Sequence, residues 1–228
     1  MLNRYGDKKI KRRRAPRFEL SGGLVCLDFV NTLDDRPSGK PKELLASYID
    51  LARFGEDTGI LDTHQVDRLF ALSQTEIAAA KHALAAAIQL REVMYEVFSA
   101  ILNKKPAPAA ALMTLNQYVQ AAAEHSLLVE VGGHFEWRFE TAAGDFEAPL
   151  WPIARSAADL LASDQLEYVR ACSSKTCRWL FLDTSKNHRR RWCDMKLCGN
   201  RAKFQRFYSR QKRSAFTRKD TKVHQGNR

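Results

Sequence analysis

The sequence predicts a mainly α-helical protein of the α+β class, with a helical N-terminal domain, a small β-hairpin and a cysteine-containing module that ends in a helix. Three observations lead to this prediction. Alanine-rich stretches carry apolar residues at the spacing of amphipathic helices. Two alternating stretches flank a Gly-Gly pair, as in a hairpin. Four of the five cysteines form two pairs of equal spacing, and 228 residues suffice for one medium and one small domain.

The charge is distributed unevenly along the chain. Residues 1–17 carry 8 Lys and Arg against 1 Asp, and residues 18–169 carry 11 against 22 Asp and Glu. Residues 170–228 carry 18 against 3, so an acidic body has two basic ends. Such asymmetry indicates a polyanionic partner for the ends, with solubility as the alternative role. Residues 1–17 and 214–228 are expected to be a disordered basic arm and a disordered basic tail.

The stretch over residues 18–33 contains an apolar, β-favouring run that includes Asp28 and leads to Asn31. A carboxylate in such a run is costly to bury without partners. Either Asp28 and Asn31 cap the next turn or satisfy backbone groups, or they form a polar patch in a ligand pocket. After a loop rich in Pro and Gly, residues 43–54 fit an amphipathic helix.

Further helices and one hairpin are predicted for the middle of the chain. Arg91 stands in the apolar face of the longest helix, which also carries Leu84, Ile88, Tyr95 and Phe98. Either its head reaches water along an apolar stem, or its guanidinium turns inward toward Asp28 or an anionic ligand. The inward alternative places Asp28, Asn31 and Arg91 in one pocket. The expected helices cover residues 63–72, 76–102, 109–125 and 151–163, and the hairpin strands cover 127–131 and 134–140.

Two cysteine pairs, Cys172 with Cys177 and Cys193 with Cys198, share the same spacing and are joined by a loop of fifteen residues. Such pairs predict one tetrahedral zinc ion with bonds of about 2.3 Å to each sulfur. The alternatives are unrelated buried cysteines or two disulfides. Because four thiolates fill the coordination shell, the zinc is expected to be structural rather than hydrolytic. The fifth cysteine, Cys26, lies in an apolar run and is expected in the core.

The segment around these cysteines resembles the CGNR zinc-finger family. The resemblance covers about residues 170–213 and implies a small zinc-binding and DNA-binding module, of the treble-cysteine-knuckle type, in a bacterial transcription regulator. Residues 27–32, LDFVNT, resemble the opening of the ABATE domain, which implies a mostly helical regulatory domain with a ligand site over residues 18–165, followed by the finger over residues 166–213. The matching finger residues are the first cysteine pair, Phe181, Asp183, Ser185, residues 190–193, Met195, residues 198–201 and Lys203.

The finger carries the residues expected to contact nucleic acid. A terminal helix is expected from Asn200 to about Arg213, with a basic stripe at three- and four-residue steps. Arginine suits guanine edges and asparagine suits adenine edges. Phosphates are therefore assigned to Arg189, Arg190, Arg191 and the stripe of Lys203, Arg206, Arg210 and Arg213, and base contacts to Asn200, Arg201 and Lys203.

Local geometry around the last cysteine gives three further expectations. Gly199 is expected to adopt positive φ in a tight turn, and Asn200 to cap the terminal helix. Phe204, Phe207 and Tyr208 are expected to pack on the zinc core.

The sequence contains no phosphate-cradling glycine loop and no plausible nucleophile–base pair. It therefore predicts a non-enzymatic DNA-binding regulator, whose N-terminal domain senses a small-molecule effector or mediates assembly, including as a homodimer. No apolar run approaches the roughly 20 residues of a membrane helix, so a cytoplasmic location is expected. One alternative is an RNA-binding protein that stacks bases on Trp179, Trp192 or Phe181. Another is a small-molecule-binding or enzymatic N-terminal domain with the finger used for docking.

Overall fold

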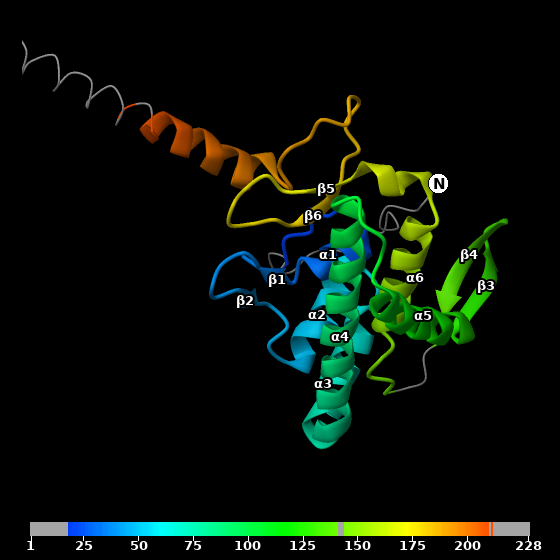
Figure 1. Ribbon diagram of the computed structural model, residues 1–228. Helices are drawn as coiled ribbons and strands as arrows, with labels where there is room; N and C mark the ends of the chain where they lie inside the picture. Colours follow the sequence, from blue (N-terminus) through cyan, green and yellow to red (C-terminus); the bar gives the residue numbers. More distant parts are fainter. Residues whose placement is uncertain (1–17, 141–143, 210, 212–228) are drawn as a thin grey trace, which may run out of the picture.

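The computed structural model describes residues 18–140, 144–209 and 211, and it is mainly helical with short antiparallel strand pairs (Figure 1). The predicted α+β class is therefore confirmed. The basic arm, the basic tail, Arg210 and Arg213 lie outside the described residues. The helices are α1 (Val25–Val30), α2 (Tyr48–Thr58), α3 (Thr63–Thr75), α4 (Ile77–Leu102), α5 (Ala109–Glu124) and α6 (Leu150–Leu161), followed by a short 3-10 turn, η1 (Asp164–Tyr168).

The strands form separate two-stranded pairs. They are β1 (Leu33–Asp34) with β2 (Lys42–Glu43), β3 (Ser126–Val131) with β4 (His134–Phe139), and β5 (Val169–Ala171) with β6 (Leu180–Leu182). A π-helical turn, η2 (Met195–Gly199), leads into a helix over residues 200–209, which projects from the body (Figure 1). None of the helices in the described part of the chain combines the length and apolar character that crossing a bilayer requires.

Helix α4 is the centre of the molecule and packs against α1, α2, α3, α5 and α6. Its alanines let neighbouring helices approach closely, and Ala83 and Ala87 are buried. The predicted core face is slightly rotated, because Leu84 and Tyr95 lie only at the margin of the core. Helices pack on several sides of α4 and decide which of its residues are buried. A single apolar face read from the sequence does not reveal these neighbours. The buried row is Ala80, Ala83, Ala87, Leu90, Arg91, Met94, Val97 and Phe98.

The β-favouring run before Asn31 forms a helix, α1, so the intrinsic preference of its residues for a strand does not decide its structure. Residues 26–30 are all buried, and α1 packs against α4, α6 and β6. Burial on every side outweighs the weak intrinsic preference of Val and Phe for strands. The helix expected from residue 43 instead begins after Ser47, whose backbone N–H donates to Asp50 Oδ2 at 2.9 Å in a capping box.

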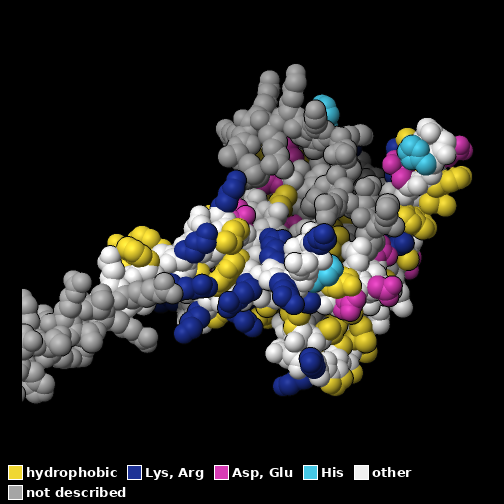
Figure 2. All heavy atoms as spheres, turned by 90° about the horizontal axis from the view of Figure 1, so that it is seen from above, with side chains coloured by type: hydrophobic (Ala, Val, Ile, Leu, Met, Phe, Trp, Pro, Cys, Tyr) yellow, Lys and Arg dark blue, Asp and Glu magenta, His cyan; other side chains and the backbone are white. Residues whose placement is uncertain are grey.

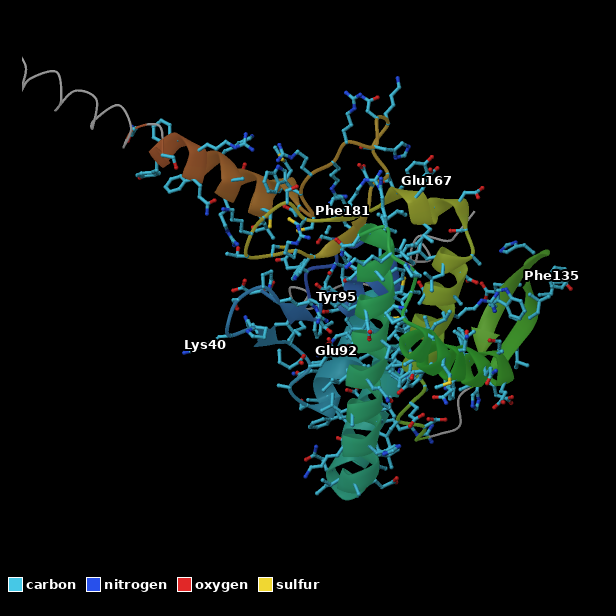
Figure 3. All side chains as sticks on the ribbon, in the orientation of Figure 1. Lys40, Glu92, Tyr95, Phe135, Glu167 and Phe181 are labelled. Atoms are coloured by element: carbon cyan, nitrogen blue, oxygen red, sulfur yellow. The ribbon has the colours of Figure 1, made fainter. Side chains whose placement is uncertain are left out.

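The predicted hairpin of β3 and β4 is confirmed, with Val131 opposite His134 across the turn. Gly132 and Gly133 have φ of 58° and 84°, as a two-residue turn between twisted strands requires. The hairpin projects on the side of the molecule away from the terminal helix, and its labelled Phe135 is exposed (Figure 3).

The finger is joined to the helical body through β5 and β6. Val169, Leu180 and Leu182 belong to the main hydrophobic core and not to the small cluster around the cysteines. The Leu182 N–H donates to the Gly22 carbonyl at 2.8 Å, which adds the segment before α1 to the edge of β6. The base of the finger is therefore part of the same packed unit as the helices.

Candidate metal centre and nucleic-acid interface

The four paired cysteines converge on one point. Their Sγ atoms all lie within 4.8 Å of one another, and all four residues are buried. The Sγ atoms of Cys177 and Cys193 are 3.6 Å apart, and those of Cys193 and Cys198 are 3.7 Å apart. A tetrahedron of sulfurs with bonds of about 2.3 Å to zinc has edges of about 3.8 Å. The donor set therefore fits one tetrahedral metal ion, consistent with a structural zinc.

The sulfurs also influence one another electrostatically. Hydrogen bonds with Cys177 and Cys193 lower the pKa of the Cys172 thiol. Hydrogen bonds with Cys172 and Cys193, followed by burial, raise the pKa of Cys177. Four thiolates this close require a compensating cation, which a divalent metal supplies as it displaces the protons.

The two knuckles are built by local backbone geometry. The Cys172 N–H donates to the Trp179 carbonyl at 2.8 Å, and Arg178 between them has a left-handed φ of 59°. The Ser173 N–H donates to the Arg191 carbonyl at 2.8 Å, which ties the first knuckle to the chain entering the second. These backbone hydrogen bonds hold the first cysteine pair beside the segment that leads to Cys193, independently of the metal.

The second knuckle ends in the π-helical turn η2, whose last residue is Gly199. A Cβ on Gly199 would lie 2.4 Å from Met195 Sδ, so the Met195 side chain packs closely over this glycine. The expectation of positive φ at Gly199 was wrong, because the residue lies in the π-helical turn and not in a left-handed turn. The expected cap at Asn200 was also wrong. Asp194 caps this turn by accepting from the Leu197 N–H at 2.7 Å, and Asn200 is already helical and exposed.

Asp183 organises the basic loop between the cysteine pairs. Its carboxylate accepts from the Ser185 hydroxyl at 2.6 Å, the Ser185 N–H at 3.0 Å and the Arg190 N–H at 2.7 Å. Burial by itself raises the pKa of Asp183, but the bonds from Ser185 and Arg190 hold that pKa below its ordinary value. The side chain is therefore an ionised hub that shapes residues 183–190.

Arg190 differs from its two neighbours. Its Nε donates to the Trp192 carbonyl at 2.8 Å, its Nη2 donates to the Cys193 carbonyl, and its guanidinium carbon lies 4.6 Å from the centroid of the Phe181 ring. These contacts brace the finger. Arg189 and Arg191 are exposed, so they are the members of this run that face solvent.

A groove of about 680 Å³ separates the first knuckle from the terminal helix. Lys175 and Arg191 line one wall, and Arg201 and Arg206 line the other. None of the described residues that line this basic groove is acidic. Figure 2 shows Lys and Arg side chains gathered over this end of the molecule. Lys175 was not predicted from the sequence as a contact residue. Its position between Cys172 and Cys177 could have indicated that it lies beside the metal centre.

The outer face of the terminal helix carries a second feature. Phe204, Phe207 and Tyr208 are 62%, 57% and 48% exposed, so the expectation that they pack on the zinc core was wrong. The helix turns Ala202 and Gln205 toward the groove, which leaves the aromatic rings on the opposite side. Phe204 and Tyr208 contact each other, with centroids 4.5 Å apart. Lys203 is exposed on the same helix and does not line the basic groove.

Of the three residues of the predicted pocket, Asp28 lies in α1, Asn31 directly follows it and Arg91 lies on α4. Each of them has partners within the protein. Asp28 accepts from the Gly22 N–H at 2.7 Å. The Asn31 amide donates to the Leu180 carbonyl and accepts from the Leu180 N–H, both at 2.8 Å, and so clamps β6. The expectation that Asp28 and Asn31 satisfy backbone groups is therefore confirmed, but the partner of Asn31 in a strand far away in the sequence was not predicted.

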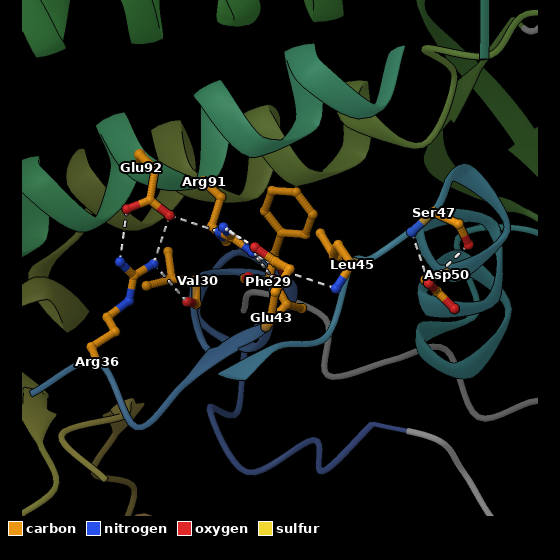
Figure 4. Close-up of polar contacts among 10 residues, drawn as sticks. Phe29, Val30, Arg36, Glu43, Leu45, Ser47, Asp50, Arg91 and Glu92 are labelled. Carbon is orange, nitrogen blue, oxygen red and sulfur yellow. Dashed lines mark hydrogen bonds and ion pairs between the residues drawn. The ribbon is translucent and has the colours of Figure 1, made fainter. Parts of the chain in front are cut away.

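Arg91 turns inward and is 2% exposed, but its partner is Glu43 rather than Asp28 (Figure 4). Its Nη1 and Nη2 donate to Glu43 at 2.6 and 2.7 Å, and its Nε donates to Glu92 at 2.8 Å. Burial by itself lowers the pKa of Arg91, but the bonds to Glu43 and Glu92 raise it overall. Glu92 also accepts a hydrogen bond from Arg36 Nη1 at 2.7 Å (Figure 4). The Arg36 guanidinium lies over the ring of Tyr95, which is on α4 like Glu92. A shared ligand pocket for Asp28, Asn31 and Arg91 therefore stays a prediction.

Two family comparisons match almost the whole described chain. The model of the ABATE family, described as "Putative stress-induced transcription regulator", matches residues 23–164. The model of the CGNR zinc finger matches residues 168–211, which include all four clustered cysteines. A search of curated proteins gives no match. Neither description names an enzyme.

Proposed function

Because the chain belongs to the ABATE family and carries a CGNR zinc finger, we propose that it is a non-enzymatic transcription regulator whose finger binds duplex DNA. The N-terminal domain then senses an effector or mediates assembly, including as a homodimer. We also place the protein in the cytoplasm, where reducing conditions keep cysteines available for metal. The observation that carries the proposal is the basic groove beside the metal centre.

The groove has the charge that a DNA backbone requires. Lys175, Arg191, Arg201 and Arg206 project from two segments that the metal centre holds in fixed relation. Phosphate contacts of this kind position a protein on DNA without reading its sequence. Arg189 extends the same positive surface, whereas Arg190 is assigned to bracing the finger. Base edges are assigned to Asn200, Arg201 and Lys203, which lie exposed at the start of the terminal helix.

A second candidate, binding of single-stranded RNA or DNA, is favoured by one observation. Phe204, Phe207 and Tyr208 present exposed rings on a basic helix, and such rings stack on unpaired bases. The stacking platforms named from the sequence support it less well. Phe181 is fully buried under Arg190, and Trp192 packs beside the cysteines.

The test is a salt titration of the full chain on duplex and single-stranded DNA. Replacing Arg189 and Arg191 by Ala removes two phosphate contacts and should flatten the salt slope on duplex DNA by about 1.8. The matched control replaces Arg68 on α3 and Lys81 on α4, which removes the same charge from exposed positions outside the finger.

An unchanged slope in the finger variant, or an equal loss in the control, would contradict the proposal. Tighter binding to single strands that is lost in Phe204→Ala and Tyr208→Ala would instead support the second candidate.

A further inference from the structure

A cavity of about 210 Å³ lies between the N-terminal segment and the metal centre. The body contributes Glu19, Ser21, Asp34 and Asp35, and the finger contributes Trp179 and Arg201. The metal centre itself also lines the cavity on the finger side, through Cys177, Cys193 and Cys198. In Figure 1 the segments around β1 lie directly below the finger. We call this space the junction cavity. It is distinct from the basic groove, although Arg201 lines both.

The junction cavity collects polar atoms that have no partner. Ser21 Oγ, Asp35 Oδ1 and Trp179 Nε1 are buried without a hydrogen bond, and all three residues line the cavity. Among the described residues the fourth such atom is Arg36 Nε, whose guanidinium is otherwise engaged by Glu92. Folded proteins pair the great majority of buried polar groups, so three orphans around one space indicate a missing partner.

The orphans specify the chemistry of that partner. On the body side, Asp35 accepts hydrogen bonds, and the neighbouring carboxylates of Asp34 and Glu19 favour a positive charge. On the finger side, Trp179 Nε1 only donates, and Arg201 adds a positive charge. Asp35 has a left-handed φ of 53°, a conformation that a non-glycine residue adopts uncommonly.

We propose that the junction cavity binds a small zwitterion of the free amino acid class. Its ammonium group pairs with Asp35, and its carboxylate accepts from Trp179 Nε1 and Arg201. The volume of about 210 Å³ is smaller than the roughly 300–1,000 Å³ of pockets for drug-sized ligands. It therefore agrees with a molecule as small as a free amino acid. A ligand with one charge would pair with only one wall and would leave either the buried acceptor Asp35 Oδ1 or the buried donor Trp179 Nε1 without a partner.

The position of Arg201 gives the site a regulatory consequence, which rests on the proposed DNA binding. A carboxylate in the junction cavity draws the Arg201 guanidinium away from the basic groove and removes one phosphate or base contact. The zwitterion is therefore expected to weaken duplex binding. A ligand shifts an equilibrium between two states only if it binds them with different affinity. Here the two states differ in whether the Arg201 guanidinium lies at the basic groove or in the junction cavity.

Binding is tested first without DNA, on the full zinc-loaded chain, by calorimetry and thermal unfolding with each free amino acid in turn. At least one should bind with one-to-one stoichiometry and raise the Tm. Asp35→Asn and Trp179→Phe should each weaken it by about tenfold, as expected for loss of a charge-assisted or buried hydrogen bond. Asp67→Asn, an exposed carboxylate on α3, is the matched control and should bind like the wild type. Zinc content of one per chain checks that each variant is folded.

The proposal is overturned if no amino acid binds, or if Asp35→Asn and Trp179→Phe bind it as tightly as the wild type does. In that case ordered water is the partner of the three buried polar atoms. A duplex titration with and without the bound amino acid tests the regulatory part separately. If the amino acid binds but the affinity for duplex DNA is unchanged, only the regulatory role of Arg201 is overturned, and the binding site stands. A chain that binds the amino acid but no duplex overturns the proposed function and not the site.

Discussion

The clamp of Asn31 on β6 yields the most informative stability prediction, because it joins residues far apart in the sequence. Both hydrogen bonds, from Nδ2 to the Leu180 carbonyl and from the Leu180 N–H to Oδ1, are 2.8 Å long and buried. Asn31→Ala removes both partners of a buried backbone unit. The variant should therefore lose stability and loosen the attachment of the finger.

The magnitude follows from the two backbone groups left without partners. Each buried, unsatisfied group costs about 1–3 kcal/mol, so the expected loss for the two groups is about 2–6 kcal/mol in the free energy of unfolding. For a chain of this size, each kcal/mol lowers the Tm by about 2–4 °C. A loss of about 3 kcal/mol thus corresponds to roughly 6–12 °C.

The assay combines urea unfolding with the rate of zinc transfer to a chelator under native conditions. Leu180 follows Cys177 closely, so a looser β6 should also release zinc faster. Asn103→Ala is the matched control, since its amide donates to the Ser99 carbonyl at 2.7 Å at the exposed end of α4. The control should change stability by less than about 0.5 kcal/mol. A loss below about 1 kcal/mol in Asn31→Ala, with zinc release unchanged, would refute the role of the clamp.

Two further predictions concern the finger itself. Cys193→Ser should reduce bound zinc from one per chain to none by elemental analysis, because structural zinc contributes on the order of 10 kcal/mol; helical circular dichroism should largely persist, and retained zinc would contradict the ligand assignment. Asp183 has a folded pKa below its unfolded value of about 3.9, so the stability it contributes is present above about pH 4 and is lost as pH falls through the folded pKa. Asp183→Asn should lower the free energy of unfolding by about 2–3 kcal/mol at neutral pH. Between about pH 5 and pH 3 the variant should then lose less stability than the wild type does. Urea unfolding across this range is the measurement, and parallel pH profiles would disprove the role of the carboxylate.

The sequence by itself determined the features that depend on neighbours along the chain. The spacing of the two cysteine pairs located the metal ligands, the periodicity of apolar residues located α4 and α5, and the Gly-Gly pair located the turn between β3 and β4. The unequal distribution of charge separated an acidic body from a basic finger. Each of these signals is carried by residue spacing or composition along the chain, so no tertiary contact is needed to interpret it.

Only the tertiary structure decided which polar side chains meet. Arg91 pairs with Glu43 across the body, Asn31 holds β6, and Arg190 folds back on the finger while its neighbours face solvent. The same is true of α1, a β-favouring run made helical by packing on every side. Such outcomes depend on distances between segments separated by tens of residues, and intrinsic preferences are too weak to fix them.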